Sequence, residues 1–268
     1  MSVSTNLQGL IDAATPYWAG EAEVVRTYWT WGQRTRESDR LWLARQCFKE
    51  FLGFGVGSKG LGLFHGLADE LRRVYAKIDI EIDRHEVLET AATLYAEFAH
   101  YCAFADAHDR LAQPGEPKLN PTMLEIWPEE KELARVRREH MERHGVLGRR
   151  ASLFTEGGYC TLFAEGMKLR ERPTPGHEVA DRLIADACAR VYDDEFGHML
   201  KGVVGLDGEG FAPSDWRTLT DISLEQLRNR ILMRNAQFGR PVPEARIKEL
   251  LAGRCRPITF DYERAKIA

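Results

Sequence analysis

The sequence lacks the features that mark several common classes of protein. Its five cysteines are an odd number and include no Cys-x-x-Cys pair, which argues against a disulfide framework, a zinc ribbon and a rubredoxin-type iron site. No Gly-x-Ser-x-Gly motif occurs, and no dinucleotide-binding glycine motif follows a predicted strand. The formal net charge of −4 is unlike that of a typical nucleic-acid-binding protein. These absences direct attention to sites built from histidine and carboxylates.

Long apolar runs and leader-like segments are also missing. No apolar segment is long enough to span a membrane, and the first residues lack a basic region followed by an apolar run. We therefore expect no membrane insertion, and we expect a cytoplasmic location in which the thiols stay reduced.

Helical signals dominate the chain. Strand-like alternation is limited to residues 78–82, which is too short to build a sheet, and a glycine-rich stretch at residues 53–62 lacks the ending of a phosphate-binding loop. Capping residues, prolines and uninterrupted apolar periodicity predict helices at residues 17–31, 38–52, 61–77, 83–113, 128–144, 149–172 and 177–204. Two more helices are predicted, one starting at Ser223 and one with Pro243 in its first turn and Gly253 just past its end.

Two Glu-x-x-His motifs fall within long predicted helices. They are Glu97 with His100 and Glu195 with His198. Residues three apart lie on one helix face, so each pair can hold a metal ion from one side. Chance alone supplies about one Glu-x-x-His motif in a chain of this composition. A motif therefore indicates a metal site only where the neighbouring residues on its helix face support that interpretation. Both glutamates lie on apolar stripes, where a carboxylate is costly to bury unless it is paired or bound to metal. Two core ion pairs are the structural alternative.

A bundle that holds two metal ions also needs a carboxylate from each of two further helices. On the third helix Glu156 lies on an apolar face, whereas Glu165, nine residues later, is expected on the opposite side. On the first helix we prefer Glu70 to Glu50. Glu50 precedes the glycine-rich break and is expected far from the level of Glu97.

The order Glu, Glu-x-x-His, Glu, Glu-x-x-His resembles the ferritin-like di-iron carboxylate superfamily. The resemblance covers about residues 61–204, and residues 112–148 match the long crossover that this topology needs. It implies an all-α fold: a ferritin-like four-helix bundle in a single domain, residues 1–268, with additional helices before residue 61 and after residue 204. The metal ligands it implies are Glu70, Glu97, His100, Glu156, Glu195 and His198.

Two further residues are expected beside the metals. Asp194 directly precedes the second motif, and this Asp-Glu-x-x-His form resembles bacterial multicomponent monooxygenases, which implies that Asp194 orients a ligand histidine. The first motif has Ala96 in that place, and Gly197 stands where arginine is frequent, so we assign no subfamily. Tyr159 shares the Glu156 face and is a candidate for proton transfer, with core packing as the alternative. No catalytic residue is assigned.

The implied ligands suit iron, because oxygen donors dominate, and manganese can replace one or both ions. The resemblance implies activation of dioxygen, and the additional helices favour an oxygenase or oxidase acting on a small organic substrate. A rubrerythrin-like peroxidase or ferroxidase and a metal-free helical adaptor are the alternatives. Because the chain has no electron-transfer motif, electrons must come from an external donor or from the substrate. We expect no nucleic-acid or membrane partner. The substrate and the oligomeric state stay open, with a homodimer among the options.

A further histidine pair lies outside this pattern. His140 and His144 are four residues apart in a predicted helix and could hold a metal ion. Arg137, Arg138 and Arg143 surround them, so the sequence instead indicates an exposed helix face.

Overall fold

The computed structural model describes residues 4–53, 62–156 and 161–258, without the side chains of Glu156, residues 196–201 and Val204. Within this part every regular element is helical, apart from one β-bridge between Ile78 and Ile82. The predicted all-α class is confirmed. None of the described helices is both long and apolar enough to cross a membrane.

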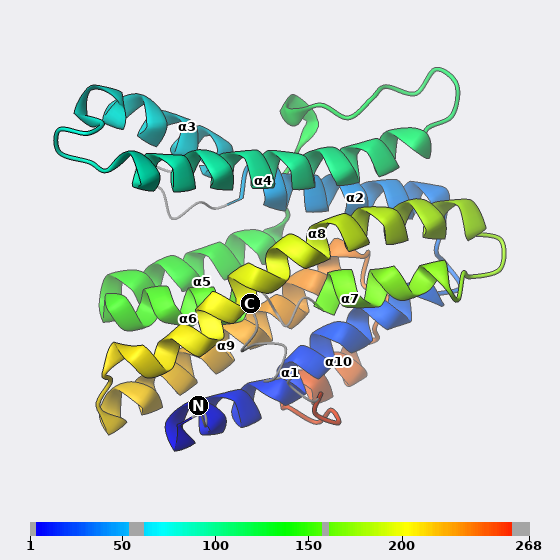
Figure 1. Ribbon diagram of the computed structural model, residues 1–268. Helices are drawn as coiled ribbons and strands as arrows, with labels where there is room; N and C mark the ends of the chain where they lie inside the picture. The colour runs from blue at the N-terminus through cyan, green and yellow to red at the C-terminus, as the bar shows by residue number, and fades with distance from the viewer. Residues whose placement is uncertain (1–3, 54–61, 157–160, 259–268) are drawn as a thin grey trace. The chain divides into compact units, whose positions relative to one another are not determined.

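The chain divides into two compact units. Residues 1–34 and 127–268 form unit 1, and residues 35–126 form unit 2. Figure 1 labels the helices of both units. Of the four helices predicted to form the bundle, the first two lie in unit 2 and the other two in unit 1. The single ferritin-like domain therefore stays a prediction.

The described part of unit 2 contains three α-helices and two short 3-10 helices. Thr35 begins its first helix with a capping box, in which Thr35 and Ser38 each bond the other's backbone N–H. Asp83 caps the longest helix through the backbone N–H of His85, at 2.7 Å. The elements are α2 (Arg36–Phe51), α3 (Gly62–Val74), η1 (Tyr75–Lys77), α4 (Arg84–Arg110) and η2 (Pro121–Met123).

Helices α2 and α4 pack side by side in opposite directions. The guanidinium of Arg36 donates to the carbonyl oxygen of Leu111 at 3.2 Å, at one end of the pair. Further along α2, the rings of Trp42 and Phe104 lie 6.3 Å apart. Near the other end, the Cys47 thiol lies 3.8 Å from the carbonyl oxygen of Tyr101; the α2 numbers rise as the α4 numbers fall. This register sets which residues of the two helices meet.

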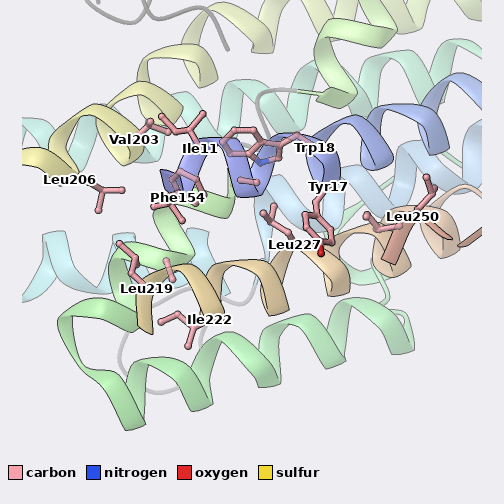
Figure 2. Packing of buried hydrophobic residues seen from close by; sticks show 14 of the residues in the cluster. Ile11, Tyr17, Trp18, Phe154, Val203, Leu206, Leu219, Ile222, Leu227 and Leu250 are labelled. Carbon is pink, nitrogen blue, oxygen red and sulfur yellow. The ribbon is translucent and has the colours of Figure 1, made fainter. Parts of the chain in front are cut away.

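Unit 1 is the larger helical assembly. Its elements are α1 (Thr5–Trp29), α5 (Pro128–His144), α6 (Val146–Glu156), α7 (Thr161–Met167), η4 (Lys168–Arg170), α8 (Glu178–Val204), η5 (Gly205–Glu209), α9 (Pro213–Gln237) and α10 (Glu244–Leu251). Figure 2 shows side chains of α1, α6, α8, α9 and α10 meeting in its core. At the centre the rings of Trp18 and Phe154 lie 5.2 Å apart, and both are fully buried. Burial of such large apolar side chains is the main stabilising contribution.

A buried charge cluster crosses this core. The carboxylate of Glu21 on α1 accepts hydrogen bonds from Arg230 and Arg234 on α9, at 3.0 to 3.1 Å. Burial alone would raise the pKa of Glu21, but the two guanidinium groups lower it overall. The cluster therefore fixes α1 against α9 with its charges paired.

Two helix starts differ from the prediction by ten residues or more. Helix α1 begins at Thr5, because Ser4 caps it through the backbone N–H of Leu7, and Pro16 lies inside the helix. Helix α9 begins ten residues before Ser223, at Pro213, and the backbone N–H of Ala212 donates to Asp215 at 3.0 Å. The predicted cap at Ser223 is wrong, because Ser223 is buried in mid-helix.

Candidate metal centre

Three side chains with metal-ligating atoms meet within unit 2. They are Glu50 of α2 and Glu97 and His100 of α4. The Nδ1 atom of His100 lies 3.7 Å from Oε2 of Glu50 and 3.9 Å from Oε2 of Glu97. The imidazole is fully buried, and the two carboxylate side chains are 8% and 16% exposed. We call these three residues the unit 2 cluster.

Local sequence and helix packing position the cluster together. Glu97 and His100 are three apart on α4, so they share a face as predicted. The antiparallel register that pairs Cys47 with Tyr101 brings Glu50, one turn later on α2, to the level of this pair. Gln46, one turn before Glu50, donates from Nε2 to Oε1 of Glu50. The other oxygen of Glu50 is the one that faces His100.

The spacing of these atoms fits a single metal ion. Ligand bonds from nitrogen and oxygen to a divalent metal are about 2.1 Å long, so two ligand atoms on one ion lie about 3 to 4.2 Å apart. Both separations from His100 Nδ1 fall in this range. Two carboxylates with one imidazole are donors that suit iron or manganese. The unit 2 cluster could thus hold a metal ion.

Four aromatic side chains of unit 2 pack against one another, and three of them directly follow a cluster residue in sequence. The rings of Phe51 and Tyr101 lie 4.8 Å apart, and Phe64 and Phe98 complete the group at 4.5 to 6.0 Å between neighbouring rings. Burial raises the pKa of the Cys47 thiol well above its ordinary value, and the negative charge of Glu50 adds to the effect. The Cys47 thiol, one turn before Glu50 on α2, therefore stays protonated.

The expectation that Glu50 lies far from the level of Glu97 is wrong. The Glu70 side chain is exposed, whereas Glu50 is buried beside His100. Phe64 of α3 packs on Phe98 of α4, and Glu70 lies six residues beyond Phe64, about 9 Å along the helix. The α3–α4 hairpin therefore carries Glu70 away from the level of His100.

No family model, curated protein or solved structure matches the chain. The interpretation of the unit 2 cluster and of the second motif therefore depends on their own residues and geometry.

The second Glu-x-x-His motif lies within α8 of unit 1, where a helix was predicted. The Glu195 side chain is partly buried there, and the preceding Asp194 is exposed. The side chains of Glu156 and His198 lie outside the described part of the structure, and so does all of Tyr159. Their predicted roles stay predictions.

Glu165, which was not expected to bind metal, has cationic partners in unit 1. Its carboxylate lies 3.0 Å from the guanidinium of Arg26 and 2.7 Å from the ammonium of Lys168. Two cations that share one carboxylate oxygen account for its burial without a metal ion.

The predicted exposed face at His140 is a further correction. His140 is buried; its Nε2 lies 3.2 Å from a Glu225 oxygen, and its Nδ1 lies 3.2 Å from Nε2 of Gln226. Burial lowers the pKa of His140, and Glu225 opposes that shift in part. Leu133 and Val136, which precede His140 at helical spacing, are buried too. The spacing of Leu133, Val136 and His140 could have predicted that His140 is buried, but the prediction gave more weight to the neighbouring arginines.

Proposed function

We propose that the protein is a non-haem di-iron oxygenase or oxidase that uses dioxygen to oxidise a small organic molecule. The observation that carries the proposal is the unit 2 cluster, in which a buried imidazole nitrogen faces two carboxylate oxygens at 3.7 and 3.9 Å. Buried carboxylates need compensation, and a metal ion at this position would supply it. The oxygen-rich donors favour iron, with manganese as a substitute.

The sequence supports a second half-site of the same composition. Glu156 and the pair Glu195 with His198 again offer two carboxylates and one imidazole. With Glu50 in the place first given to Glu70, the proposed ligands of two iron ions are Glu50, Glu97, His100, Glu156, Glu195 and His198. Asp194 is proposed to orient one of the ligand histidines.

In this proposal the chain holds the metals and limits the access of water. Two ferrous ions, when bound, supply electrons for the reduction of dioxygen. The burial of His100 and Glu50 would limit the access of water to the unit 2 cluster, which strengthens the bonds between metal and carboxylate. Further electrons are proposed to come from an external donor or from the substrate.

Metal content tests the site. Protein reconstituted with ferrous iron under anaerobic conditions should bind about two ions per chain, as a six-ligand site requires. His100→Ala and His198→Ala should each lose about half of the iron or more. Glu165→Ala is the matched control, because the Glu165 carboxylate is already paired with Arg26 and Lys168. A folded wild-type protein that binds no iron would leave the helical adaptor as the function.

An iron-excess assay separates the oxygenase from the ferroxidase. A ferroxidase should oxidise many equivalents of added ferrous iron and deposit ferric mineral, whereas an oxygenase should consume dioxygen only in proportion to bound iron until an organic substrate is added. Sustained iron turnover that no organic additive changes would replace the proposal with the ferroxidase.

A further inference from the structure

Gln46 of α2 is hydrogen-bonded to the proposed ligand Glu50. Its side chain is buried, one helical turn before Glu50, and its Nε2 donates a hydrogen bond to Oε1 of that carboxylate. Oε2 of the same carboxylate faces Nδ1 of His100 at 3.7 Å. The two oxygens of Glu50 therefore have separate partners.

We propose that Gln46 is a positioning residue that holds Glu50 as a monodentate ligand, bound to the metal through Oε2 alone. The inference rests on the metal site proposed above. An amide nitrogen can only donate, so it engages Oε1 and turns Oε2 toward His100. Because Gln46 and Glu50 are both buried, water does not readily replace this hydrogen bond.

The apolar character of the α2 face supports a specific role for this amide. Trp42, Leu43, Cys47 and Phe51 are all buried along α2, so the helix has ample apolar surface without Gln46. A buried amide is costlier to desolvate than a methionine of similar length. Gln46 places that amide where the orientation of one metal-facing carboxylate depends on it.

Gln46→Met tests the inference, because it keeps the length of the side chain and removes the donor. Cobalt(II) is the probe, since its visible absorption weakens as its coordination number rises. In the variant both oxygens of Glu50 become available to the ion. We expect the absorption of bound cobalt to weaken and its affinity to fall by about tenfold or more, as is usual when a partner that orients a ligand is lost.

Gln237→Met is the matched control. Gln237 is fully buried in unit 1 and accepts a hydrogen bond from Arg234, far in sequence from every proposed ligand. Its loss should lower the melting temperature of the metal-free protein but leave the affinity and spectrum of cobalt unchanged. A purely structural role for Gln46 would give this same pattern.

The outcomes distinguish failure of the role proposed for Gln46 from failure of the proposed metal site. Unchanged cobalt affinity and spectrum in folded Gln46→Met, with normal binding by the wild type, would overturn the role of Gln46 and leave the metal site standing. Absence of cobalt and iron binding by the wild type would overturn the site, and this inference with it. If Gln46→Met does not fold, Gln46→Leu, which also lacks the donor, is measured against the same expectations.

Discussion

At the residue scale, Glu50 and Glu70 give opposite expectations for one experiment. Glu50→Ala should remove about half of the bound iron, because the carboxylate oxygen that faces His100 is lost. Glu70→Ala should leave the iron content unchanged, because the Glu70 side chain is exposed. Both variants remove the same group and the same charge, so each controls for the other in metal analysis after anaerobic reconstitution. Iron loss in Glu70→Ala alone would restore the original choice.

The two outcomes for Glu97 and Glu50 have a common physical explanation. The spacing of Glu97 and His100 is local, and helical geometry alone puts both on one face, so the sequence was sufficient to predict it. The level of Glu50 depends on contacts between α2 and α4, such as Trp42 with Phe104. Apolar periodicity in the sequence shows which face of a helix is buried, but not how far the helix is shifted along its neighbour. The level of Glu50 relative to His100 therefore could not be predicted.

Glu116 gives a pH prediction at the same scale. Hydrogen bonds from Arg36 and from the backbone N–H of Gln113 lower the pKa of Glu116 from 4.5 to about 2. A carboxyl group whose pKa is lowered in the folded state stabilises that state fully above about pH 4.5. This contribution is lost as the pH falls through about 2. Glu116→Gln should therefore flatten the acid dependence of unfolding in this window, measured by denaturant titration. An unchanged slope would contradict the Arg36 contact.

At the scale of elements, Gly166 controls how closely α7 approaches α8. A Cβ atom at Gly166 would lie 2.4 Å from the Cys188 sulfur and 3.1 Å from its Cβ. Gly166→Ala should therefore lower the free energy of unfolding by about 1–3 kcal/mol, as overpacking usually does. Chemical denaturation of the metal-free protein measures the change.

Two further variants make the Gly166 result specific. Cys188→Ala in the Gly166→Ala background should recover part of the loss, because it removes the sulfur that clashes. Gly9→Ala is the control, since Gly9 is exposed inside α1 with no atom near the new Cβ. That change should raise the free energy of unfolding by about 0.5–1 kcal/mol, because alanine reduces the conformational entropy of the unfolded chain. Equal effects at both glycines would contradict close packing at Gly166.

The helix boundaries show where local signals are sufficient. The predicted helix at residues 128–144 has the bounds of α5, because Pro128 at its start and Gly145 after its end both act locally. The start of α9 was misplaced, because Ser223 and Gln226 resemble a cap in sequence. In the folded chain Gln226 instead bonds Thr155 of α6 at 2.8 Å, and this tertiary contact overrides the local pattern.

At the scale of the whole molecule, unit 2 is a continuous segment inserted into unit 1. The chain leaves unit 1 after Arg34 and returns at Trp127. The proline-rich stretch before Trp127 signals the second boundary, but the first falls at the capping box of α2, where composition gives no sign of a new unit. The single domain of residues 1–268 came from the ferritin-like resemblance and not from these boundaries, and it stays a prediction.

The six-ligand proposal makes a prediction for both units. Bound manganese should slow amide hydrogen exchange in α2 and α4, because Glu50, Glu97 and His100 would be tied to one ion and local opening would break those bonds. If Glu195 and His198 are also ligands, exchange in α8 should slow at the same metal concentration. Helix α10, which carries no proposed ligand, should not change and serves as the internal control. Protection that stays within α2 and α4 would mean a three-ligand site in unit 2, and it would remove the second motif from the metal centre.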